Sequence, residues 1–214
     1  MARPTIVLVH GAFADASGFR GLYDGLLGQD VTVLAPPNPL RGLTGGDGDY
    51  LKSVIAEIDG PVLLVGHSYG GSVITAAGTA DNVVGLVYIS GFAPDEGENL
   101  TDLQSKFPAP GIVPYIVEHK LADGGQEFTL SPDGFHESFC ADIPAEDAAF
   151  YAISQRPLAG IAEQLTGRGD DRLPGRLGVL VATALEPIRR RHWPHCPQCF
   201  GRSPAAPTGR VTRR

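Results

Sequence analysis

The stretch that decides the fold runs from Pro61 to Ala77 and reads PVLLVGHSYGGSVITAA. Its first five residues are apolar throughout, which is typical of a strand buried on both faces of a parallel sheet. The residues after Gly70 are small and apolar, which suits a helix packed closely against that sheet. Between them, Gly66–Gly70 fits the pattern GxSxG, in which the serine lies on a sharp strand-to-helix turn with its Oγ exposed. This context predicts that Ser68 is a nucleophile.

Three further apolar runs of strand length surround this stretch: Thr5–Val9, Val31–Leu34 and Val83–Ile89. Segments of helix length separate the four runs, at about 17–28, 47–58 and 70–80. Strands that alternate with helices over short connections are typical of βαβ units wound around a parallel sheet. A fifth buried strand is predicted at Leu177–Ala184, so the fold class is α/β with a mainly parallel sheet.

The region between about 94 and 165 has a different character, with turn pairs between short amphipathic pieces. Pro144, followed by Glu146 and Asp147, predicts a helix through Gln155, because proline and acidic residues suit a first helical turn. The plain interpretation is a small helical insertion after the fourth strand.

A second chemical element, His10-Gly11-Ala12-Phe13, directly follows the first strand. Acyl transfer needs two backbone N–H donors directed at the developing oxyanion. The residue after the nucleophile, here Tyr69, normally supplies one, and a loop after an early strand supplies the other, here Ala12 or Phe13. His10 has two interpretations: it orients this loop by hydrogen bonding, or it acts in acid–base catalysis.

Four segments in order, VLVHGAFADASGF, APPNPLRGL, VGHSYGGSVI and VVGLVYISGFAPDEGENL, resemble small bacterial esterase-type α/β-hydrolases, which are related to the plant methylesterase and hydroxynitrile lyase group. The resemblance covers about residues 3–165. It implies a three-layer α/β-hydrolase fold with a helical cap, and a Ser–acid–His triad. Ser68 matches the family's nucleophile, and Ala12 and Tyr69 match its oxyanion positions. The corresponding division is a core at 1–93 and 166–187 and a cap at 94–165.

The acid and the histidine of the triad are harder to place. Glu186 follows the strand after the cap, and Asp95 follows the strand before it, so either is a candidate acid. His195 is the candidate histidine, with His192 close by and His119 and His136 in the cap as weaker alternatives. The strand and helix that close the family's fold have no counterpart here, because residues 188–214 show no periodicity and are expected to form a disordered tail.

The tail also differs in charge. Residues 1–167 hold 7 Lys and Arg against 21 Asp and Glu, whereas residues 168–214 hold 10 Arg, no Lys and 3 acidic residues. Out-of-frame translation of a GC-rich gene would produce such a composition, and the nucleotide sequence would test this. Cys196, Cys199, His192 and His195 crowd into eight residues, which is poor geometry for zinc, so no metal or cofactor is expected.

The net charge of −7 argues against a nucleic-acid partner, because phosphate binding needs a basic face. No apolar run is long enough to span a bilayer, and three cysteines give no disulfide framework, so we expect a cytoplasmic protein without a membrane partner. Its oligomeric state is not indicated. The favoured function is hydrolysis of a small carboxylic ester through an acyl-enzyme at Ser68. The alternatives are a lyase on the same scaffold and a truncated or catalytically impaired homologue.

Overall fold

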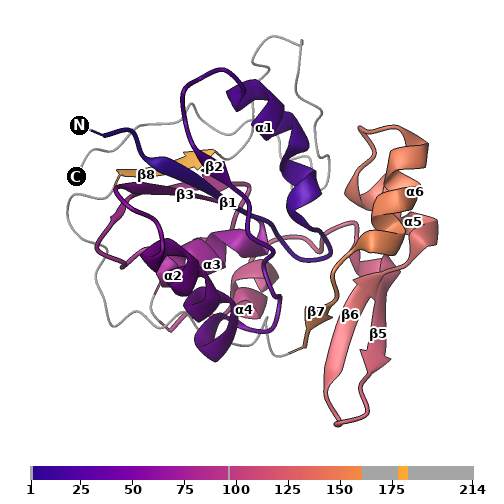
Figure 1. Ribbon diagram of the computed structural model, residues 1–214. Helices are drawn as coiled ribbons and strands as arrows, with labels where there is room; N and C mark the ends of the chain where they lie inside the picture. The colour runs from indigo at the N-terminus through magenta and orange to yellow at the C-terminus, as the bar shows by residue number, and fades with distance from the viewer. Residues whose placement is uncertain (1, 96, 161–177, 183–214) are drawn as a thin grey trace.

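A parallel sheet of five strands forms the centre of the molecule (Figure 1). The computed structural model describes residues 2–95, 97–160 and 178–182. The strand order is β2-β1-β3-β4-β8, and every neighbouring pair is parallel. The strands are β1 (Thr5–Val9), β2 (Val33–Leu34), β3 (Val62–His67), β4 (Val83–Ile89) and β8 (Gly178–Ala182). The predicted parallel α/β sheet is therefore confirmed.

Helices cover both faces of this sheet and give three layers. Figure 1 shows α1 on one face and α2 and α3 on the other. Successive strand residues point to opposite faces, so Val7 and Val9 join the large core under α2 and α3, while Leu8 joins a smaller cluster with Phe19. The helices of this part are the 3₁₀ turn Ala16–Phe19, α1 (Arg20–Leu26), the π-helical turn Leu43–Asp47, α2 (Gly48–Ala56) and α3 (Tyr69–Ala77).

Most predicted elements match the structure closely. The strands at Thr5–Val9 and Val83–Ile89 begin and end where expected. The segment expected as one helix over 17–28 begins instead as a 3₁₀ turn, because the Asp15 carboxylate accepts the Ser17 N–H at 2.8 Å and fixes a tight first turn. The strand expected at Val31–Leu34 is limited to its last two residues, at the sheet edge.

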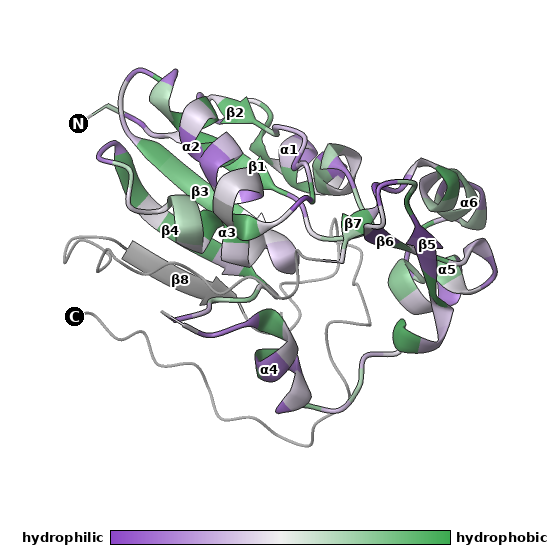
Figure 2. Cartoon of the chain, turned by 90° about the horizontal axis from the view of Figure 1, so that it is seen from below, coloured by the Kyte–Doolittle hydropathy of each residue, from purple (hydrophilic) through white to green (hydrophobic). Residues whose placement is uncertain are grey.

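The insertion after β4 contains more than the predicted helices. A three-stranded antiparallel sheet, in the order β5-β6-β7, accompanies the helices. Figure 2 shows that β5 is hydrophilic over much of its length, and all five of its residues are exposed. Its sequence, IVEHK, has neither the continuous apolar run of a buried strand nor an alternation of apolar and polar residues. The elements are α4 (Leu100–Ser105), a 3₁₀ turn (Val113–Tyr115), β5 (Ile116–Lys120), β6 (Gln126–Leu130), α5 (Pro132–Phe139), α6 (Ala145–Ser154) and β7 (Leu158–Ala159).

The helix predicted to begin at Pro144 is α6, with Pro144 at its N-cap. The antiparallel hairpin closes through the Leu121 N–H, which donates to Gly125 O at 2.9 Å, and Gly124 adopts a φ of 86°. The expected helices are present, and the antiparallel sheet beside them, which was not predicted, makes the insertion mixed α/β. The predicted boundaries between core and cap remain predictions. No helix within the described part of the chain has the length and apolar character needed to cross a membrane.

Candidate active site

Ser68 lies between the end of β3 and the start of α3, with φ 52° and ψ −123°. A positive φ is rare for a residue other than glycine and costs free energy, so the surrounding structure must hold it. The carbonyl of Ser68 accepts N–H bonds from Gly71 at 2.9 Å and Phe92 at 3.1 Å. These bonds tie the serine to α3 on one side and to the loop after β4 on the other. The half-buried side chain is left at the carboxyl end of the sheet.

The glycines around Ser68 permit close backbone approach. A Cβ at Gly66 would lie 2.5 Å from Gly70 O, and one at Gly70 would overlap Val9 O and lie 2.8 Å from His10 O. A Cβ at Gly71 would overlap the carbonyl oxygen of Phe92. The strained turn at Ser68 is thus clamped between the ends of β1 and β4, and any side chain at these glycines would push the turn out of place.

The loop after β1 lies against the serine. A Cβ built on Gly11 would lie 2.8 Å from Ser68 Cβ and 3.4 Å from Ser68 Oγ. Ala12 follows and is half-buried, and Phe13 is buried at a φ of 58°. The structure therefore brings the loop that carries Ala12 to the nucleophile candidate, as an oxyanion hole requires.

His10 uses both ring nitrogens within this loop. Its Nδ1 lies 2.9 Å from Gly11 O, and its Nε2 accepts the backbone N–H of Asn38 at 3.0 Å. Because Nε2 accepts, Nδ1 carries the proton and donates to Gly11. The Asn38 amide also donates to His10 O at 3.1 Å. Burial lowers the pKa of His10, although its bond to Gly11 O opposes this. These contacts favour the loop-orienting role over acid–base catalysis.

His67 directly precedes Ser68 at the end of β3. Burial lowers its pKa to about 4, and the nearby His10 adds to the effect because two imidazolium charges would repel each other. Both imidazoles are therefore neutral at pH 7, and no positive charge from them opposes proton uptake by a neighbouring base.

Tyr69 and Asp47 form a buried pair that the sequence does not reveal. The Tyr69 hydroxyl donates to Asp47 Oδ2 at 2.6 Å. Asp47 is 0% exposed and Tyr69 2% exposed. In the sequence Asp47 is only an acidic residue at a predicted helix start, and its partner is 22 positions away. Tyr69 begins α3, whose N–H groups point toward the helix N-terminus, where negative charge is stabilised.

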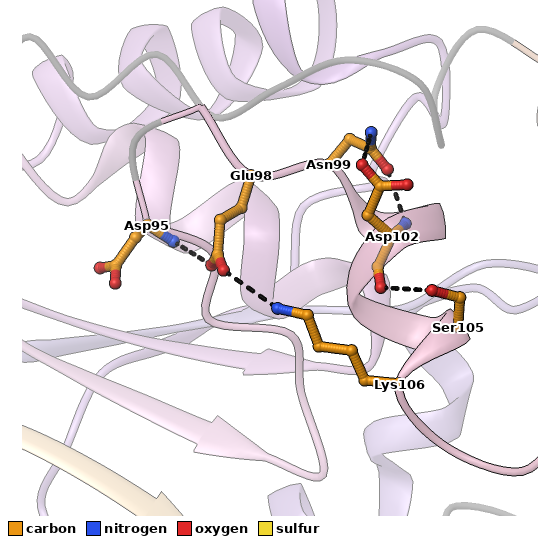
Figure 3. Close-up of polar contacts among 6 residues, drawn as sticks. All are labelled: Asp95, Glu98, Asn99, Asp102, Ser105 and Lys106. Carbon is orange, nitrogen blue, oxygen red and sulfur yellow. Dashed lines mark hydrogen bonds and ion pairs between the residues drawn. The ribbon is translucent and has the colours of Figure 1, made fainter.

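Asp95, one of the two acid candidates, is exposed in the loop after β4. Figure 3 shows its carboxylate directed away from the neighbouring polar side chains, while its backbone N–H donates to Glu98 Oε2 at 2.9 Å. Lys106 Nζ lies 3.5 Å from the other Glu98 oxygen. Among the described residues, nothing donates a hydrogen bond to the Asp95 carboxylate. The structure therefore gives Asp95 no imidazole partner within that part of the chain.

The remaining triad candidates are either engaged elsewhere or not described. His119 Nε2 lies 2.7 Å from Thr129 Oγ1 on the exposed hairpin, and His136 Nε2 lies 3.0 Å from Ile143 O. Neither of these two contacts involves Ser68. Glu186, His192 and His195 lie outside the described residues, as do Cys196 and Cys199. Within the residues that are described, no cluster of three or more His, Cys, Asp or Glu could hold a metal ion.

A strained serine at a strand–turn–helix junction, with a loop from β1 against it, defines the class of α/β-hydrolases. The sequence profile of the alpha/beta hydrolase family matches residues 6–205, and the chain belongs to that family. This confirms the family that the four sequence segments resemble.

Two relatives are similar over part of their length. A carbendazim hydrolyzing esterase from Nocardioides sp. (strain SG-4G) is 34% identical over 121 residues, which are 50% of this chain and 49% of that protein. A pyrethroid hydrolase from Sphingobium wenxiniae (strain DSM 21828 / CGMCC 1.7748 / JZ-1) is 29% identical over 123 residues, 51% of this chain and 38% of that protein. The chain thus spans half or less of the length of these relatives.

Solved structures share the fold at low sequence identity. Polyneuridine aldehyde esterase superposes with a TM-score of 0.66 and 20% identity, over 84% of this chain and 80% of that one. Tomato methylketone synthase I complexed with 2-tridecanone superposes with a TM-score of 0.67 and 18% identity, over 87% of this chain and 81% of that one. These similarities support the fold.

Proposed function

We propose that this chain is a serine hydrolase that cleaves a small carboxylic ester through an acyl-enzyme at Ser68. The observation that carries the proposal is the geometry of Ser68, held at a φ of 52° between β3 and α3 with Gly11 directly against its side chain. A strained, half-buried serine beside a donor-bearing loop suits nucleophilic attack on a carbonyl.

The reaction divides into two steps. Ser68 Oγ bonds to the ester carbonyl carbon, its proton passes to a base, and the C–O bond to the alcohol breaks as the alcohol takes up a proton. Water then attacks the acyl-enzyme, which releases the carboxylic acid and restores the Ser68 hydroxyl. The backbone N–H groups of Tyr69 and Ala12 are the proposed donors to the carbonyl oxygen, which becomes negative in both steps.

The base and its orienting acid are proposed from the sequence. His195 is the proposed base, with Glu186 or Asp95 as the acid that orients it. His10 is unsuited to this role because both of its ring nitrogens are already engaged, one with Gly11 O and one with the Asn38 N–H. A serine without a base is a weak nucleophile at neutral pH, so the His195→Gln variant should lose most of the activity of the chain.

Two similarities support an ester as the substrate class. The relatives described as a carbendazim hydrolyzing esterase and a pyrethroid hydrolase are both named for hydrolysis. The matched segments cover about half of this chain and half or less of each relative. This overlap is too small to assign either relative's substrate to this chain.

A fluorophosphonate probe tests the proposal directly. Ser68 Oγ would bond to phosphorus as the P–F bond breaks and fluoride leaves, and the probe would mark the serine covalently. We expect labelling of the intact chain, its loss in Ser68→Ala, and full labelling in Ser53→Ala, a control that removes an exposed hydroxyl on α2. A folded protein that resists the probe would contradict the acyl-enzyme proposal and favour a lyase or a non-catalytic homologue.

A further inference from the structure

Asp47 is a completely buried carboxylate with three hydrogen-bond donors. Its Oδ1 accepts the Arg41 N–H at 2.8 Å, and its Oδ2 accepts the Gly42 N–H at 3.3 Å and the Tyr69 hydroxyl at 2.6 Å. Burial of a carboxylate costs several kcal/mol unless donors replace the lost water, so these three bonds compensate for its burial. Among the described residues, the donors come from two places: the backbone turn at 41–42 and the residue that follows Ser68.

The backbone turn that Asp47 contacts is itself strained. Leu40 adopts a φ of 59°, which is strained for a residue with a side chain, and Gly42 adopts a φ of 117°, which glycine tolerates. Asp47 closes this turn twice, since its backbone N–H also donates to Gly42 O at 2.5 Å. Strained backbone persists only where the surrounding bonds over-determine it. The turn and the Tyr69 side chain are therefore held by the same carboxylate.

Asn38, a few residues before this turn, contacts the loop after β1 that carries Ala12. Asn38 donates its backbone N–H to His10 Nε2 at 3.0 Å and its side-chain amide to His10 O at 3.1 Å. His10 in turn donates to Gly11, which lies against Ser68. Residues 38–47 thus contact the loop that carries Ala12, through His10, and also Tyr69, so they reach both proposed donors of the oxyanion hole.

We infer that Asp47 is a positioning residue of the oxyanion hole: its carboxylate fixes the Tyr69 side chain and thereby the direction of the Tyr69 backbone N–H. This inference rests on the proposed function, because it assigns that N–H as a donor to the oxyanion. Asp47 does not touch the substrate. It acts on the reaction through Tyr69, and through the turn at Arg41 and Gly42.

Asp47→Asn tests the carboxylate with almost no change in shape. An asparagine keeps one oxygen acceptor and places an NH₂ group where the second oxygen was. That NH₂ group must face one of the two backbone N–H groups, so one donor loses its acceptor inside the protein. Tyr69→Phe removes only the hydroxyl and leaves the turn with both of its bonds. Asp49→Asn is the matched control, because Asp49 is exposed and caps Gly45 N–H at 2.9 Å in the same stretch.

The first measurement is the rate of fluorophosphonate labelling at Ser68 in the full chain, with folding of each variant checked by circular dichroism. We expect a fall of about 30-fold in Asp47→Asn and about tenfold in Tyr69→Phe, less than removal of an oxyanion donor outright, and less than twofold in Asp49→Asn. The double variant should fall by less than the product of the two single effects, because both residues belong to one hydrogen-bond network. With p-nitrophenyl acetate, kcat should fall while KM changes less than twofold.

The second measurement separates this inference from the proposed function. Amide hydrogen exchange at Tyr69 reports whether its N–H is held in place, and it requires no activity. We expect faster exchange in Asp47→Asn and Tyr69→Phe, and unchanged exchange in Asp49→Asn. If the intact chain resists the probe, the proposed function is wrong. The exchange rate of the Tyr69 N–H then still shows whether Asp47 holds this N–H in place. Unchanged Tyr69 exchange in both variants overturns the positioning role, as does labelling at the rate of the intact chain.

Discussion

Acidification should destabilise the fold before its carboxylates titrate, because His67 is held neutral. Its pKa is about 4 in the folded chain, against about 6.5 for an exposed histidine. Between these values the unfolded chain binds a proton that the folded chain does not, so the free energy of unfolding falls as the pH falls. One such group contributes a loss of about 2 kcal/mol between pH 7 and pH 5. His10 should add to the loss, because burial also lowers its pKa.

Urea unfolding at several pH values between 7 and 5 measures this loss, since exposed carboxylates titrate mainly below that window. The His67→Gln variant should show a shallower dependence on pH, by about 2 kcal/mol across the window. His119→Gln, on the exposed strand β5, is the control and should retain the slope of the intact chain. Equal slopes in the intact chain and His67→Gln would refute the argument, whatever the stability of the variant at pH 7.

Three other predictions concern the turn at Ser68 and its surroundings. Gly70→Ala should destabilise the fold by about 2 kcal/mol or more in urea unfolding, because the new Cβ would overlap the backbone at the end of β1. The control is Gly21→Ala in α1, where nothing lies within 4 Å of the new Cβ, and it should be neutral or slightly stabilising. Ser68→Gly should be about 1 kcal/mol more stable than Ser68→Ala, because only glycine adopts its positive φ without strain; equal stabilities would mean that the turn relaxes. Glu127→Gln should change the free energy of unfolding by no more than about 0.5 kcal/mol, because its partner Arg41 is 48% exposed.

The sequence was sufficient to predict the parts of the molecule that depend on local pattern. The uninterrupted apolar runs of β1 and β4 predict buried parallel strands without reference to the rest of the chain. The glycines at 66 and 70 likewise predict a tight turn at Ser68, because glycine is the residue that tolerates such close backbone contacts. The turn at Ser68 and the parallel α/β sheet were therefore accessible from the sequence.

Other features depend on contacts between distant residues. The exposed strand β5 shows no alternation of apolar and polar residues, and it is a strand because β6 pairs with it. The pairing of Asp47 with Tyr69 depends on the packing of α2 against α3, which no local pattern encodes. His195 and Glu186, the proposed base and one of its two candidate acids, lie outside the described residues and remain predictions, and so does the role of Asp95.

The turn at 40–42 also touches the insertion, and burial decides which of its contacts matters. Leu40 O accepts the Ala159 N–H of β7 at 2.9 Å, and Arg41 reaches Glu127 of β6 at 2.9 Å. Arg41 is 48% exposed and Glu127 18% exposed, so water reaches the guanidinium and can replace the carboxylate at little cost. Asp47, on the other side of the same turn, is 0% exposed, so a donor that loses it finds no water in its place. Two charge-removing substitutions at side chains that contact the same turn should therefore differ widely: Glu127→Gln leaves labelling of Ser68 unchanged, and Asp47→Asn slows it.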